Sequence, residues 1–84
     1  MNELEILKNK IKYRASYRGT KEMDILLTSF VSSVVDNLKY LELLKLDEFI
    51  NLNDEDIYNF YKTGDSTLSF NDKKILNLFK SFKI

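Results

Sequence analysis

The 84-residue chain contains no cysteine, histidine, proline or tryptophan, and it has only two glycines. Without cysteine and histidine there are no disulfides, thiolate nucleophiles, imidazole bases or common zinc ligand sets. No apolar run is long enough to span a membrane, and we expect neither a signal peptide nor a membrane span. A metal site built from Asp and Glu alone stays open, but no Asp-x-Asp-x-Asp-Gly calcium loop is present, and we expect no metal site.

Charge is balanced over the whole chain but not along it. Residues 1–21 carry a net charge of +4, residues 22–65 carry −7, and residues 66–84 carry +3. A basic segment followed by an acidic one can steer a charged partner. The same charges can equally attract each other within the fold, and the sequence leaves both interpretations open.

Apolar residues recur with the period of an α-helix over most of the chain. The pattern predicts a first helix that ends near Tyr17 and a second that follows the i, i+3, i+4 spacing from Met23 to Val34. Turn or cap chemistry at Asp36 and Asn37 precedes a third helix, over residues 41–50. This helix is apolar on more than one side, and we expect it to be the most buried.

Two further helices are predicted near the end of the chain. Asn53 is a good N-cap for the fourth helix, which Gly64 closes. The run Ser69-Phe70-Asn71-Asp72 resembles a capping box and precedes a fifth helix. We therefore predict an all-α fold, a small antiparallel bundle of five short helices, in one domain that spans residues 1–84.

Few residue types remain for catalysis. Glu22 and Asp24 are only two residues apart, so on a helix they do not share a face and do not form an acid/base pair. We expect no catalytic residue and no enzymatic activity, since catalysis needs a water-excluding site with tuned pKa values.

The basic first segment also suggests a nucleic-acid binder, because its lysines and arginines are interleaved with Tyr13 and Tyr17. The second helix would be the reader in a helix-turn-helix arrangement. It begins with Glu22 and Asp24, however, which phosphates would repel. Nucleic acid is therefore the weakest of the alternatives.

The segment Arg18-Gly19-x-x-Glu22-x-Asp24 lies at the junction between the first two helical patterns. A glycine there can take a positive φ that other residues resist. The arginine and the two carboxylates would then crowd around one exposed turn. The plainest interpretation of Arg18 and Glu22 is an i,i+4 ion pair worth about 0.3–0.5 kcal/mol.

Two blocks of residues together resemble the signature of the SdhE family, the small FAD assembly factors of succinate dehydrogenase. The first is Tyr13-Arg14-x-Ser16-x-Arg18-Gly19-x-x-Glu22-x-Asp24-x-Leu26-Leu27-x-x-Phe30, and the second is Asn53-Asp54-x-Asp56-Ile57-Tyr58-Asn59-Phe60, followed by Gly64. The resemblance covers nearly the whole chain. The chain departs from the family in its arginine run, which Ala15, Ser16 and Tyr17 interrupt, in Thr20 for a methionine and in Phe60 for a tryptophan.

The resemblance implies an assembly factor, or chaperone, that binds the flavoprotein subunit of succinate dehydrogenase and promotes covalent attachment of FAD to a histidine of that subunit. The FAD belongs to the partner, so this chain binds no cofactor of its own. Fumarate reductase is a second candidate client. By carry-over, the partner-binding residues are Arg18, Gly19 and Glu22, flanked by Arg14 and Asp24.

Secondary partner contacts are assigned by the same resemblance to Tyr13, Asp56 and Tyr58. Asp56 and Tyr58 each have a structural role as the alternative to a partner contact. Asp56 can cap the helix, and Tyr58 can pack its ring between helices. We expect a monomer, in a bacterial cytoplasm or, for a processed form, the mitochondrial matrix. A helical adaptor with a different client is the main alternative function.

Overall fold

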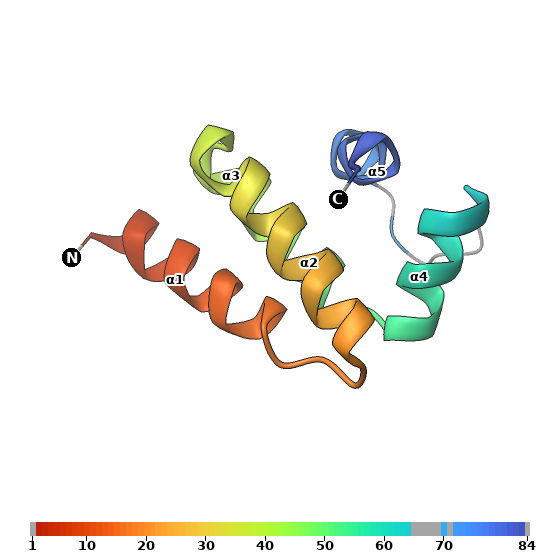
Figure 1. The fold of residues 1–84 in the computed structure, drawn as a ribbon. Helices are drawn as coiled ribbons and strands as arrows, with labels where there is room; N and C mark the ends of the chain where they lie inside the picture. Colours follow the sequence, from red (N-terminus) through yellow and green to blue (C-terminus); the bar gives the residue numbers. More distant parts are fainter. Residues whose placement is uncertain (1, 65–69, 71, 84) are drawn as a thin grey trace.

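The computed structural model describes residues 2–64, 70 and 72–83, and these residues form helices and no strands (Figure 1). The elements are α1 (Glu3–Ala15), α2 (Lys21–Val34), the 3-10 turn η1 (Val35–Asn37), α3 (Tyr40–Ile50), α4 (Asp54–Thr63) and α5 (Lys73–Ser81). The predicted all-α fold class is confirmed. None of the described helices is long and apolar enough to cross a membrane.

Side-chain caps define where four of the helices begin, and Asn2 caps α1 by accepting the backbone N–H of Glu5 at 2.8 Å. Thr20, Asn53 and Asp72 each accept a hydrogen bond from a backbone N–H two or three residues further on, at 3.2, 2.8 and 3.0 Å respectively. The predicted cap at Asn53 is confirmed, whereas Asp72 is itself the cap of α5 and not the acidic third residue of a capping box that begins at Ser69. Ser69 and Asn71 of the predicted capping box lie outside the described residues.

The helix boundaries follow the predicted ones with one difference. The first helix ends at Ala15 rather than near Tyr17. Asp36 and Asn37 lie in the turn η1, so the turn alternative is confirmed, and α3 begins after Lys39. The backbone N–H of Lys39 donates to the side chain of Glu42, at 2.8 Å.

Gly64 ends α4 as predicted. Its φ is +71°, in the left-handed region that glycine adopts without strain, and its N–H donates to the carbonyl of Phe60 at 2.8 Å. A Cβ at this position would lie 3.2 Å from the side chain of Lys80 on α5. The left-handed glycine therefore also allows the end of α4 to approach α5.

Phenylalanine rings form the centre of the core. Phe30, Phe49 and Phe79 come from α2, α3 and α5, and all three are fully buried. The centroid of the Phe79 ring lies 4.9 Å from that of Phe30 and 5.0 Å from that of Phe49. Both pairs have the edge-to-face geometry that aromatic rings prefer. Phe60 of α4 stacks on Phe79 at 6.4 Å, which confirms it as a core aromatic.

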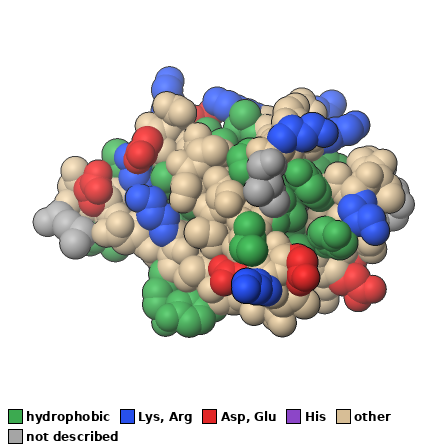
Figure 2. All heavy atoms as spheres, viewed as in Figure 1, with side chains coloured by type: hydrophobic (Ala, Val, Ile, Leu, Met, Phe, Trp, Pro, Cys, Tyr) green, Lys and Arg blue, Asp and Glu red, His purple; other side chains and the backbone are tan. Residues whose placement is uncertain are grey.

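The sequence predicts α3 to be the most buried helix, but one of its apolar sides is exposed to solvent. Leu43 and Leu46 are fully buried, whereas Leu41 is 74% exposed and Leu44 is 38% exposed. Hydrophobic side chains also reach the surface between charged ones on the face drawn in Figure 2. The large exposed hydrophobic residues are Ile6, Tyr13, Tyr17, Ile25, Tyr40, Leu41, Leu44 and Tyr58.

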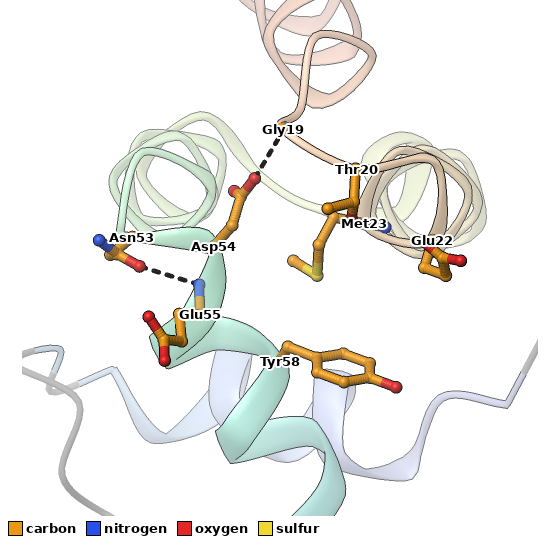
Figure 3. A pocket seen from close by; sticks show the side chains of 8 residues that line it. All are labelled: Gly19, Thr20, Glu22, Met23, Asn53, Asp54, Glu55 and Tyr58. Atoms are coloured by element: carbon orange, nitrogen blue, oxygen red, sulfur yellow. Dashed lines mark hydrogen bonds between the residues drawn. The ribbon is translucent and has the colours of Figure 1, made fainter.

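The arrangement of the helices brings distant parts of the sequence together. α1 lies against α2 and α3, and α5 lies against α3 and α4. In Figure 1, α1 and α2 run side by side in opposite directions, whereas α5 is viewed nearly end-on. The loop between α1 and α2 lies close to the first turn of α4, and the candidate site is built there (Figure 3).

Candidate functional site

Asp54, at the start of α4, holds the loop between α1 and α2. One of its oxygens, Oδ1, accepts hydrogen bonds from the Arg18 guanidinium, through Nε at 2.9 Å and through Nη2. The other, Oδ2, accepts the backbone N–H of Gly19 at 3.0 Å (Figure 3). The Arg18 side chain is only 9% exposed, so this ion pair is shielded from water on the arginine side. The two blocks that carried the family resemblance meet at this carboxylate.

The contacts of Arg18 and Gly19 differ from those predicted by local spacing. Arg18 pairs with Asp54 and not with Glu22. Gly64 is the only described glycine with a positive φ, so the expected left-handed conformation at Gly19 is wrong. A Cβ at Gly19 would lie 3.5 Å from the Asp54 carboxylate, an ordinary contact distance. The backbone conformation at position 19 therefore does not require glycine. The effect of the glycine is that no side chain covers the surface of the loop there.

Arg14 also has an ion-pair partner within the fold. Its Nη1 donates to both carboxylate oxygens of Asp47, each at 2.7 Å, and so ties α1 to α3. The Arg14 side chain is partly exposed. Each of the two signature arginines thus has a carboxylate partner in this chain, more than 30 residues away in sequence.

A groove of about 630 Å³ opens beside the Gly19 loop, between the first turns of α2 and α4 (Figure 3). Met23 extends from the α2 side toward the ring of Tyr58, which extends from α4. Met23 is otherwise buried, and Tyr58 is 40% exposed. The lining residues are Gly19, Thr20, Glu22, Met23, Asn53, Asp54, Glu55 and Tyr58.

Two of the predicted partner-binding residues, Gly19 and Glu22, line this groove, and so does Tyr58, a predicted secondary contact. Arg18 does not line it but binds Asp54, which does. Asp24 accepts a hydrogen bond from the hydroxyl of Thr28 on the same helix at 3.1 Å, outside the groove.

The remaining predicted contacts lie elsewhere. Tyr13 packs against Tyr17 with ring centroids 4.6 Å apart and the ring planes tilted by 44°, and both residues are well exposed. Asp56 is exposed in the first turn of α4, where Asn53 and not Asp56 provides the cap. Tyr58 is 40% exposed and therefore not packed away between helices, and the ammonium of Lys62 lies 5.2 Å from its ring centroid.

The groove contains residues that sequence reasoning did not assign to the site, namely Thr20, Met23, Asn53, Asp54 and Glu55. All five lie within the two signature blocks, and this was a usable signal. The pairing of Asp54 with Arg18 was not visible, because the two residues are 36 positions apart.

Every charged residue that lines the groove is acidic. The Asp54 carboxylate is neutralised by Arg18, whereas within the described part of the chain neither Glu22 nor Glu55 has an ion-pair partner. In Figure 3 their side chains lie on opposite sides of the groove. The described residues contain no group of three or more histidine, cysteine, aspartate or glutamate side chains that could hold a metal ion.

Comparisons with known proteins agree on one family. A family model described as flavinator of succinate dehydrogenase matches residues 9–83. A Drosophila ananassae protein named succinate dehydrogenase assembly factor 2-B, mitochondrial, is 33% identical over 79 residues, which cover 92% of this chain and 48% of that protein. A Penicillium rubens protein named succinate dehydrogenase assembly factor 2, mitochondrial, is 34% identical over 64 residues, which cover 76% of this chain and 20% of that protein.

The chain thus spans less than half the length of either relative. No solved structure matches it. The family match includes both signature blocks and all the residues that line the groove.

Proposed function

This chain belongs to the family of succinate dehydrogenase flavinators, and on that premise we propose that it is a non-catalytic assembly factor for the succinate dehydrogenase flavoprotein subunit. In this role it binds that subunit and promotes covalent attachment of FAD to it. The observation that carries the proposal is the meeting of the two signature blocks at Asp54, beside a groove lined by residues of both.

The chemistry of the chain supports a role without catalysis. It has no histidine or cysteine, and the described residues form no metal cluster. The flavin and the residue that accepts it belong to the partner. The chain would act by holding the partner in a conformation in which these two groups are correctly placed, and positioning alone is able to accelerate a reaction strongly.

The bare surface at Gly19 gives this proposal a specific test. Gly19→Arg would place a long charged side chain over the groove, whereas Gly19→Ala adds one methyl group at an ordinary contact distance from Asp54. We expect Gly19→Arg to prevent partner binding and Gly19→Ala to retain most of it. The measurement is in-gel flavin fluorescence of the cognate flavoprotein subunit, coexpressed with wild-type chain, either variant or none.

Covalent flavin fluorescence should rise with the wild type and with Gly19→Ala, and not with Gly19→Arg. Circular dichroism of each variant should show unchanged helicity. Equal fluorescence with and without the wild-type chain, at adequate FAD, would contradict the proposed function. The flavoprotein subunit of fumarate reductase is the second client to test in the same assay.

A further inference from the structure

The charges that this chain presents to a partner differ from those suggested by its sequence. The signature reads as basic because of Arg14 and Arg18, but both arginines have internal carboxylate partners. Arg18, the one beside the groove, is almost completely buried. It is therefore poorly placed to dock on an acidic partner surface.

The groove itself presents carboxylates around an apolar surface. Glu22 comes from the first turn of α2 and Glu55 from the first turn of α4, and neither is paired within the described residues. The Met23 side chain and the Tyr58 ring lie between them (Figure 3). An occupant that buries the apolar surface must therefore also come close to two negative charges.

Nearby cations do not reverse this balance. Lys62 lies over the Tyr58 ring and does not line the groove. Lys21 begins α2 and is exposed, but it does not line the groove either. An anionic segment in the groove would be repelled by Glu22 and Glu55, which line it, whereas a cationic one would gain charge-assisted contacts with them.

We propose that the groove binds a segment of the flavoprotein in which an apolar side chain, seated between Met23 and Tyr58, is flanked by a lysine or arginine that pairs with Glu22 or Glu55. This inference rests on the proposed function and specifies the partner chemistry at its site. The apolar side chain contributes burial, and the basic one contributes orientation and selectivity.

The first test measures the affinity of purified chain for the purified cognate flavoprotein subunit by calorimetry. We expect Glu22→Gln combined with Glu55→Gln to weaken binding about tenfold and to reduce its dependence on ionic strength. Glu5→Gln is the matched control, since it also removes a carboxylate from the first turn of a helix, but on α1 and outside the groove. The control should bind like the wild type.

The second test identifies the occupant directly. Tyr58 is replaced by the photo-crosslinking residue benzoylphenylalanine, and the crosslinked partner peptide is sequenced by mass spectrometry. The same replacement at Tyr40 is the control, because Tyr40 is similarly exposed but lies on α3 outside the groove. We expect the Tyr58 site to capture a peptide with an apolar residue next to a lysine or arginine, and the Tyr40 site not to capture it.

The two tests separate this inference from the proposed function. Wild-type binding that the double glutamine variant leaves unchanged, or a captured peptide that is acidic at the contact, would overturn the inference while the assembly-factor role stands. A wild-type chain that fails to bind the flavoprotein subunit would overturn both.

Discussion

Among single residues, Asp54 has the most contacts at the candidate site. It accepts three hydrogen bonds from the loop between α1 and α2, two from Arg18 and one from the Gly19 backbone. A charged pair with one buried member is expected to be costly to break, because the remaining charge loses its compensation. The loop that lines the groove is thus held in place by one carboxylate on a different helix.

Replacement of Arg18 should therefore reduce the stability of the whole domain. We expect Arg18→Ala to lower the free energy of unfolding by about 1–3 kcal/mol, since Asp54 keeps only the Gly19 N–H and the packed arginine stem is lost. Urea unfolding monitored by circular dichroism measures the change. Lys10→Ala removes an exposed charge as the control, and an equally small loss for both variants would show that the Arg18 pair adds nothing to stability.

For single residues, the sequence predicts features that depend only on residues nearby in the chain. The cap at Asn53 and the end of the fourth helix at Gly64 were predicted, because both follow from local backbone chemistry. The partner of Arg18 was assigned to Glu22 because only short spacings are visible in a sequence. The true partner depends on how α4 packs against the loop, which tertiary structure alone determines.

Among the elements, the start of α3 is linked to α5 by a charged contact. Glu42 accepts the backbone N–H of Lys39 and pairs with the ammonium of Lys74. The hydrogen bond from the Lys39 backbone, and then the contact with Lys74, lower the pKa of the Glu42 carboxyl below its usual value.

This shift has a definite sign in the pH dependence of stability. A carboxyl with a lowered pKa in the folded state stabilises the fold at neutral pH, and that contribution is lost as the pH falls through the lowered pKa. We expect Glu42→Gln to be less stable than the wild type at pH 7 and to converge with it in acid. Thermal melting between pH 7 and pH 2 tests this, with Glu48→Gln, an exposed acid on the same helix, as control. A constant difference across that range would contradict it.

The apolar periodicity of α3 predicts a helix but does not predict which of its faces is buried. The apolar residues of this helix predicted burial on several sides, but Leu41 and Leu44 are exposed. Periodicity gives the existence of a helix, and the packing of α1 and α5 decides which of its apolar faces is covered.

For the whole molecule, Phe79 connects the packing of the last helix to the rest of the domain. Its ring contacts rings on α2, α3 and α4 and is fully buried. We expect Phe79→Ala to lower the free energy of unfolding by about 3–5 kcal/mol, a large part of the stability of a small domain. Phe79→Leu should cost less, because it leaves a smaller cavity, and equal losses for the two would argue against a cavity origin. Chemical denaturation measures both.

The fold class could be predicted because five periodic segments, few helix breakers and the family resemblance agreed on the same answer. The groove could not, since one side comes from the Gly19 loop and the start of α2 and the other from the start of α4. Its position depends on contacts across the molecule that have no local signature in either segment.

Two aspartate variants separate an effect on the groove from an effect on the stability of the fold. Asp54→Ala and Asp47→Ala each remove the carboxylate partner of a signature arginine, but only Asp54 holds the Gly19 loop. The measurement is the rate of covalent flavin attachment to the purified flavoprotein subunit, at a temperature where both variants are folded. We expect Asp54→Ala to slow attachment at least about tenfold more than Asp47→Ala, a difference of about 1.4 kcal/mol. Equal rates for the two variants would contradict a role of the Gly19 groove in flavoprotein binding.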